Sequence, residues 1–266
     1  MTARIARRLN LVVLAAGFAA LAPSAPLLVV PQRANAAAAA AVAPAKTIVD
    51  RLVAAYPDLV VAKADGSLSV RGQSVAVDPT VTEGAVQERM AGATLGDQFS
   101  IPYPRGCDFA VPTDDQDPGR LRHEPFFRAM YGATSGAVAK NLTSVKWFGS
   151  TMTVTNINGV DKKLAAVADE LSKNPEWKKY LVNPGGSFNW RKIAGESVLS
   201  MHSFGIAVDV NVKFSDYWRW SGGVKKYTNR IPCGIAEVFE KHGFIWGAKW
   251  FHFDSMHFEY RPELLG

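Results

Sequence analysis

The chain has 266 residues, of which 48% are hydrophobic and 20% charged, so it can bury the core of one large or two small domains and is not intrinsically disordered. The formal charge is +6, but the first 36 residues hold four arginines and no acid; the rest has 26 basic and 24 acidic side chains, without the basic excess of a nucleic-acid binder. Two cysteines exclude a disulfide-dense miniprotein and a four-cysteine zinc site.

The N-terminal 36 residues have the pattern of a secretory signal peptide. Three arginines precede an apolar run over 11–21, and Ala34-Asn35-Ala36 provides a small-x-small cleavage signal. A membrane anchor would need about 20 uninterrupted apolar residues, whereas Pro23 breaks this run. We therefore expect export to the periplasm or the extracellular space, cleavage near Ala36, and no stable membrane span after processing. The alanine-rich residues 37–45 are predicted to be a low-complexity tether.

Residues 46–117 are predicted to form an N-terminal accessory segment. Apolar residues at helical spacing predict a helix over 46–56. Two short apolar runs flank Asp65-Gly66 and predict a strand–turn–strand, because Asp-Gly is a strong hairpin signal. The composition of 79–120, rich in Gly, Pro and Asp, predicts a long irregular segment.

Residues 118–266 are predicted to form the main domain. Its expected elements, in chain order, are a helix within 159–180, a turn at 183–186, a strand over 206–212, a helix over 231–242 and a last strand over 250–260. The helices are indicated by apolar faces and by Gly243 as a stop signal. The strand at 206–212 is indicated by its β-branched residues.

The two cysteines are expected to form a disulfide. Export places the chain in an oxidising compartment, where Cys107 and Cys233 can pair. A loop of that length would constrain the unfolded chain by about 4–5 kcal/mol in the entropy model. The alternative is two separate buried thiols, and the sequence gives no distance that decides between them.

Candidate metal ligands gather in two short segments, 200–209 and 250–260, which together hold three of the five histidines. A catalytic zinc site uses three ligands from His and Asp or Glu and leaves one position open for water. His202, Asp209 and His257 supply two imidazoles and one carboxylate. A carboxylate on an apolar strand, such as Asp209, is costly to bury unless it is paired or binds a metal, which strengthens this interpretation.

Two further residues of the second segment are candidates for the site. Asp254 precedes His257 by three residues, a spacing at which a base can stand beside a metal without binding it and accept a proton from activated water. The spacing does not separate His252 from His257 as the third ligand, so both remain open from the residues alone.

The two segments carry a family resemblance. Ser-x-His-x-x-Gly-x-Ala-x-Asp at 200–209, followed by Asp-x-Met-His-Phe-Glu-Tyr at 254–260, resembles the D-alanyl-D-alanine carboxypeptidase and L-alanyl-D-glutamate endopeptidase family of zinc peptidases. These share a fold with lysostaphin-type peptidases and the hedgehog signalling domain. The resemblance implies an α+β fold, in which an antiparallel sheet carries the site and helices pack on one face. The family resemblance is strong over residues 186–263, weaker over 118–185 and does not extend to 37–100.

The resemblance also implies roles for individual residues. One Zn²⁺ would be bound by His202, Asp209 and His257, with Asp254 as the general base. Some family members have Glu in place of this Asp, and the shorter side chain changes the geometry of the base. We further expect His202 at the start of the strand that contains Asp209, and His257 on or near a neighbouring strand.

Two residues are candidates for substrate binding. The family often carries a substrate-facing arginine upstream of the first motif, and the matching residue is Arg191, which could hold a substrate carboxylate through two hydrogen bonds or form an ordinary surface ion pair. Ser200 could bind substrate or shape its own turn.

Glu259 shares a strand face with His257 and could orient that ligand.

The leading functional interpretation is an exported zinc metallopeptidase that hydrolyses peptidoglycan stem peptides, as D-alanyl-D-alanine carboxypeptidases do. One alternative within the enzyme class is an L-alanyl-D-glutamate-type endopeptidase. Another is a non-catalytic zinc-binding cell-wall module on the same fold, against which the presence of Asp254 argues. A purely structural exported protein fits the clustered His and Asp residues poorly.

Overall fold

The computed structural model describes residues 45–220, 222–224 and 226–266. The predicted signal peptide and nearly all of the predicted tether therefore lie outside the described residues. Within the described part of the chain, no helix is long and apolar enough to cross a membrane.

The N-terminal part combines short helices with a small antiparallel sheet in the order β1-β2-β3. Its elements are α1 (Ala45–Ala55), β1 (Val60–Ala62), β2 (Leu68–Val70), β3 (Gln73–Val75), α2 (Val86–Arg89) and α3 (Leu95–Phe99). The predicted helix and the hairpin at Asp65-Gly66 are both present, and Gly66 has the positive φ of 83° that favours glycine. The segment 79–120 is less irregular than predicted, because it contains α2 and α3.

The middle of the chain adds helices and a two-stranded antiparallel hairpin of β4 and β5. The elements are α4 (Glu124–Tyr131), α5 (Ser135–Ala139), β4 (Leu142–Trp147), β5 (Ser150–Thr155), α6 (Val160–Leu171) and α7 (Lys178–Leu181). The hairpin turns at Phe148 and Gly149, both with positive φ, as a two-residue turn between twisted strands requires. Helix α6 lies within the predicted range of 159–180 and buries Leu164, Val167 and Leu171.

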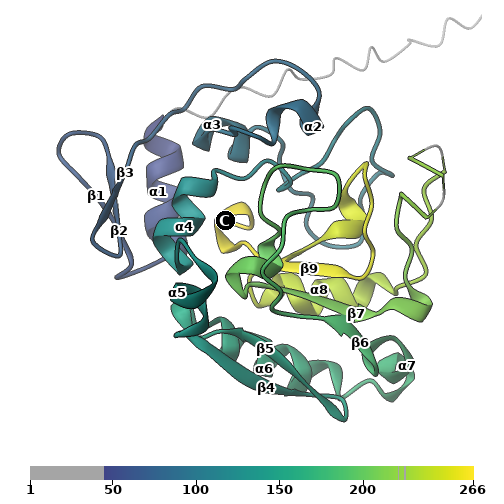
Figure 1. Cartoon of the computed structure of the whole chain (residues 1–266). Helices are drawn as coiled ribbons and strands as arrows, with labels where there is room; N and C mark the ends of the chain where they lie inside the picture. The colour runs from purple at the N-terminus through teal and green to yellow at the C-terminus, as the bar shows by residue number, and fades with distance from the viewer. Residues whose placement is uncertain (1–44, 221, 225) are drawn as a thin grey trace, which may run out of the picture. The chain divides into compact units, whose positions relative to one another are not determined.

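The central sheet has four antiparallel strands in the order β6-β7-β9-β8. The elements of this last part are β6 (Pro184–Gly186), β7 (Ala207–Asn211), α8 (Cys233–Lys241), β8 (Phe244–Trp246) and β9 (His257–Tyr260). Figure 1 shows β6, β7 and β9 side by side with α8 against the sheet. The predicted α+β fold with an antiparallel sheet is confirmed.

One face of the central sheet packs against α8 and forms part of the main hydrophobic core. The rings of Phe239 on α8 and Phe258 on β9 stack with centroids 3.9 Å apart, and Val208 and Val210 of β7 are fully buried. Because side chains alternate along a strand, the residues between these apolar positions point to the opposite face. That second face carries Asp209, and it is the face on which the polar residues gather.

The N-terminal segment shares this core. Ile48 and Leu52 of α1, and Tyr56 directly after it, are buried in the same hydrophobic cluster as the central sheet. The hydroxyl of Tyr56 donates a hydrogen bond of 2.7 Å to Glu263 near the C-terminus. The boundary between an accessory segment and a peptidase domain at 117/118 stays a prediction.

Three local predictions are wrong. Residues 183–186 were expected to be a turn, but β6 pairs with β7 as an edge strand, where proline and glycine are tolerated. The last strand begins at His257 and not at residue 250, because 250–256 turns back on itself through Asp254 N–H donating to the Gly247 carbonyl. His202 lies in a 3₁₀ turn, Met201–Phe204, that precedes β7, and not at the start of the strand.

The predicted disulfide is present. Cys107 and Cys233 have Cα atoms 5.7 Å apart and are bonded, which ties the loop after α3 to the first residue of α8. A buried ion pair reinforces the same junction, because Lys249 Nζ lies 2.5 Å from Glu240 Oε1 of α8 and also donates to the carbonyls of Pro104 and Gly106.

We expect removal of the disulfide to destabilise the protein without altering its chemistry. The bond spans 126 residues, so its loss should lower the free energy of unfolding by about 2–5 kcal/mol. Denaturant unfolding of Cys107→Ser/Cys233→Ser would measure this, with the wild-type protein in reductant as the matched control. The expectation would be contradicted if the double variant and the wild type had the same denaturant concentration at the midpoint of unfolding.

Candidate metal centre

The pairing of β7 with β9 places two of the predicted ligands opposite each other. Asp209 and His257 are direct cross-strand partners in the antiparallel register. Side chains of directly opposed residues project to the same face of a sheet and lie close together. The register therefore brings these two side chains together on the face away from α8.

The third side chain, His202, is delivered by the 3₁₀ turn that precedes β7. Ser200 caps this turn, and its hydroxyl accepts a hydrogen bond from the backbone N–H of His202. Gly205 ends the turn with a φ of 68°, and a Cβ built there would lie 2.7 Å from the Leu142 side chain. Glycine is therefore required three residues after His202, which explains this position of the first motif.

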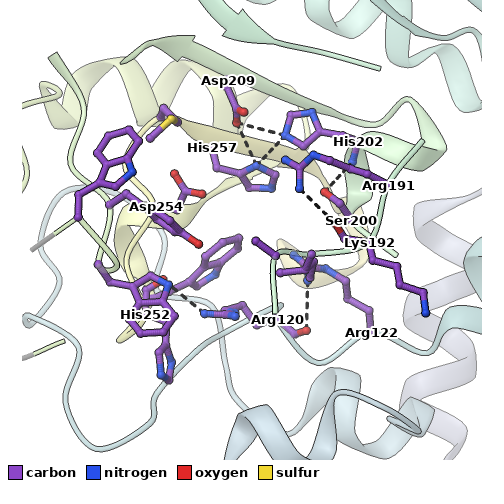
Figure 2. Close-up of a pocket in the computed structure, with 17 residues that line it drawn as sticks. Arg120, Arg122, Arg191, Lys192, Ser200, His202, Asp209, His252, Asp254 and His257 are labelled. Atoms are coloured by element: carbon purple, nitrogen blue, oxygen red, sulfur yellow. Dashed lines mark hydrogen bonds and ion pairs between the residues drawn. The ribbon is translucent and has the colours of Figure 1, made fainter. Parts of the chain in front are cut away.

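The three side chains converge on one point (Figure 2). His202 Nε2 lies 3.2 Å from His257 Nδ1 and 3.2 Å from Asp209 Oδ1, and His257 Nδ1 lies 3.1 Å from Asp209 Oδ1. Tetrahedral zinc with ligand distances of about 2.0–2.1 Å would separate its ligand atoms by about 3.3–3.4 Å. The triangle of donor atoms thus has nearly the size that such an ion requires.

The outer nitrogens of both imidazoles make hydrogen bonds that fix the tautomers. His202 Nδ1 donates to the Ser187 carbonyl at 2.6 Å, and His257 Nε2 donates to Glu259 Oε2 at 2.9 Å. Each ring then presents the lone pair of its inner nitrogen to the shared point, together with the carboxylate of Asp209. Three acceptors facing one another repel unless a cation lies between them, so the donor set fits a metal ion.

The pKa values around the triangle show that it stabilises positive charge. Burial opposes a charge on His257, but its hydrogen bonds to Asp209 and Glu259 raise the pKa of His257 to about 10. Burial also acts to raise the pKa of Asp209, yet attraction to His202 and His257 holds it well below its usual range. A proton or a metal ion can supply the positive charge that these carboxylates favour.

Asp254 stands beside the three residues without joining them (Figure 2). Its Oδ1 is buried and has no hydrogen-bond partner among the described residues. Burial and repulsion from Asp209 together raise the pKa of Asp254 to about 6. A carboxylate with a free lone pair and a pKa near neutrality is suited to accept a proton and return it.

His252 belongs to a different cluster. Its Nδ1 lies 2.5 Å from Asp117 Oδ2, and its backbone N–H donates to the other oxygen of the same carboxylate at 2.9 Å. Asp115 lies 3.8 Å from the same ring nitrogen, so the three residues form a second group of possible ligands. The separation of 2.5 Å between His252 and Asp117 indicates a hydrogen bond and is too short for two ligands of one zinc ion. It is His257, and not His252, that the structure brings against His202 and Asp209.

The triangle opens into a pocket of about 470 Å³ (Figure 2). Both predicted substrate-binding residues line it: Ser200, which is buried, and Arg191, which is exposed and whose backbone is held by hydrogen bonds with the Ser203 hydroxyl. Lining residues that the sequence did not point to include Arg120, Arg122, Tyr217, Trp218 and Trp220. None of them belongs to either motif, and Arg120 and Arg122 are far from both in the sequence, so they reach the pocket only through the fold.

A comparison with protein families supports the resemblance. Residues 194–260 match the model of a peptidase family described as D-alanyl-D-alanine carboxypeptidase. The matched segment contains both motifs and therefore all four of His202, Asp209, Asp254 and His257. No curated protein and no solved structure gave a significant match to the chain.

Metal content should distinguish the two histidine clusters. His202→Ala and His257→Ala each remove one donor from the triangle, so we expect neither purified variant to bind zinc there. His252→Ala leaves the triangle intact and should retain one zinc per chain. Metal analysis by mass spectrometry after dialysis would measure this for all three. Loss of zinc from His252→Ala with retention in His257→Ala would mean that the third ligand is misassigned.

Proposed function

We propose that this chain, whose residues 194–260 carry the pattern of the D-alanyl-D-alanine carboxypeptidase family, is an exported zinc metallopeptidase that hydrolyses peptide bonds of peptidoglycan stem peptides. The observation that carries the proposal is the triangle of His202, Asp209 and His257 with the free carboxylate of Asp254 beside it. A binding module would need no such base, so the arrangement favours an enzyme.

The donor set favours zinc among the common metals. Two imidazole nitrogens and one carboxylate oxygen, with room for a further ligand on the pocket side, form the usual composition of a catalytic zinc site. Zinc, when bound, supplies Lewis acidity that activates water and polarises a carbonyl group. Glu259 and the Ser187 carbonyl support this role, because they hold the two imidazoles with their lone pairs directed at the shared point.

Asp254 is proposed as the general base. Its buried Oδ1 would accept a proton from the attacking water and then pass it to the nitrogen of the leaving amine. Arg191 and Ser200 are proposed to contact the bound peptide from the pocket wall. The hydrogen bond from His202 N–H to the Ser200 hydroxyl leaves the hydroxyl proton free to donate to substrate.

Export is part of the proposal. The N-terminal pattern that predicts it lies outside the described residues, but the disulfide between Cys107 and Cys233 supports an oxidising compartment. A peptidase of the cell wall has to work in such a compartment, so export and substrate are consistent with each other.

Digestion of purified muropeptides tests the proposed function. Mass analysis of the products should show release of the terminal D-alanine from pentapeptide stems, and a chelator should abolish it. Cleavage deeper in the stem would instead assign an endopeptidase. Absence of any cleavage by the zinc-loaded protein would leave the non-catalytic module as the better description.

Asp254→Asn should separate metal binding from turnover. The amide keeps the size of the side chain but cannot accept the proton, so kcat should fall by a factor of roughly 10²–10⁴ while the zinc content stays at the wild-type level. Asp169→Asn is the matched control, because Asp169 is exposed on α6 and does not line the pocket. If Asp254→Asn loses zinc, the residue is a ligand and another group must be the base.

A further inference from the structure

Four cationic side chains line the pocket, and they differ in how their charge is paired. Arg122 is bound to Glu259 through two hydrogen bonds, of 2.6 and 3.3 Å. Arg191 and Lys192 are exposed, so water solvates their charges. The remaining one, Arg120, is neither paired with an acid nor well exposed.

Arg120 is only 5% exposed, yet no carboxylate of the described residues lies within 4.0 Å of its guanidinium. Its side-chain contacts are long: Nη1 lies 3.5 Å from the His252 carbonyl, Nη2 lies 3.8 Å from Met90 Sδ, and the guanidinium carbon lies 5.8 Å from the centroid of the Trp250 ring. A buried guanidinium without an anionic partner is costly, because little water remains to solvate its charge. Figure 2 shows it on the side of the pocket opposite His202, Asp209 and His257.

The backbone just before Arg120 is held by two hydrogen bonds from side chains. The indole N–H of Trp250 donates to the Pro118 carbonyl at 2.6 Å, and Arg261 Nη1 donates to the Gly119 carbonyl at 2.8 Å. A Cβ built on Gly119 would lie 2.5 Å from the Ile245 side chain, so the close approach requires glycine. These contacts fix the position of Arg120 before any ligand binds, which lowers the entropic cost of binding one.

We infer that Arg120 binds a carboxylate of the substrate peptide. The inference rests on the proposed function and adds a residue outside the segment that matches the family model, residues 194–260. A planar guanidinium at the pocket wall can donate two parallel hydrogen bonds to a carboxylate, and a bound carboxylate would supply the anionic partner that Arg120 lacks among the described residues.

Two carboxylates of a stem peptide have the required chemistry. One is the C-terminal carboxylate of a peptide that ends in D-alanyl-D-alanine. The other is the free α-carboxylate of a D-glutamate that is linked through its γ-carboxyl group. Each can be converted to an amide without other change, so two acid and amide pairs distinguish the two sources.

The test compares Arg120→Gln with the wild-type enzyme on both pairs. For the pair that carries the recognised carboxylate, the wild type should prefer the acid over the amide in kcat/KM by about 10- to 100-fold, the range expected for a charged hydrogen-bonded contact. Arg120→Gln should reduce this preference to near unity by slowing the acid substrate alone. Arg120→Lys should retain part of it. Because the preference is a ratio within one protein, a change in the folded fraction cancels.

A binding measurement separates this inference from the proposed function. Calorimetry with zinc-loaded Asp254→Asn should show the same preference for the acid, and the double variant with Arg120→Gln should not. Lys192→Gln is the matched control, since it removes an exposed cation from the same pocket, and Arg191→Gln tests the other arginine that could bind the carboxylate. An acid preference that survives Arg120→Gln overturns the inference, and its disappearance in Arg191→Gln would assign the carboxylate to Arg191 instead. Equal hydrolysis of acid and amide by the wild type also overturns the inference about Arg120, but it leaves the proposed peptidase activity intact. If no peptide is hydrolysed or bound, the result counts against the proposed function itself.

Discussion

The carboxylate of Glu259 is fully buried, and three groups share its charge: His257 Nε2 at 2.9 Å, Arg122 Nη2 at 2.6 Å and Arg261 Nη1 at 2.8 Å. Attraction to these partners outweighs the effect of burial and holds the pKa of Glu259 well below its usual range, so the residue is a permanent anion. A charge in the core is tolerated only where its partners are held in place. The orientation of one candidate ligand therefore depends on segments that are far apart in the sequence.

From Glu259 the pairing continues to the N-terminal helix. Arg261 binds Glu263 as well, and Glu263 accepts a hydrogen bond from Tyr56 at the end of α1. Arg261 and Glu263 are almost completely buried. Removal of either charge would leave the other buried without its partner, which is costly. A residue of the predicted accessory segment is thus linked, through side chains alone, to the imidazole of His257.

The sequence predicted the strand that carries Asp209 and the helix behind it more reliably than the turn that carries His202 and the start of the strand that carries His257. Strand β7 and helix α8 lie within two residues of their predicted ends, because β-branched residues and a glycine stop signal act locally. The stretch 250–256 was predicted to be part of the last strand, but its backbone turns where Asp254 N–H donates to the Gly247 carbonyl, and the Trp250 indole donates to Pro118. Arg120 and Arg122 could not be predicted as pocket residues, since only the contacts of Trp250, Arg261 and Glu259 bring their segment to the site.

The register between β7 and β9 has a consequence for how preparations of this protein can be judged. A shift of one residue would turn His257 toward α8 and place Phe258 opposite Asp209, because side chains alternate with a period of two. The donor atoms would then no longer meet, even though the secondary structure of the chain would be almost unchanged. Zinc stoichiometry would therefore report the fraction of molecules with correctly aligned strands, which circular dichroism does not distinguish.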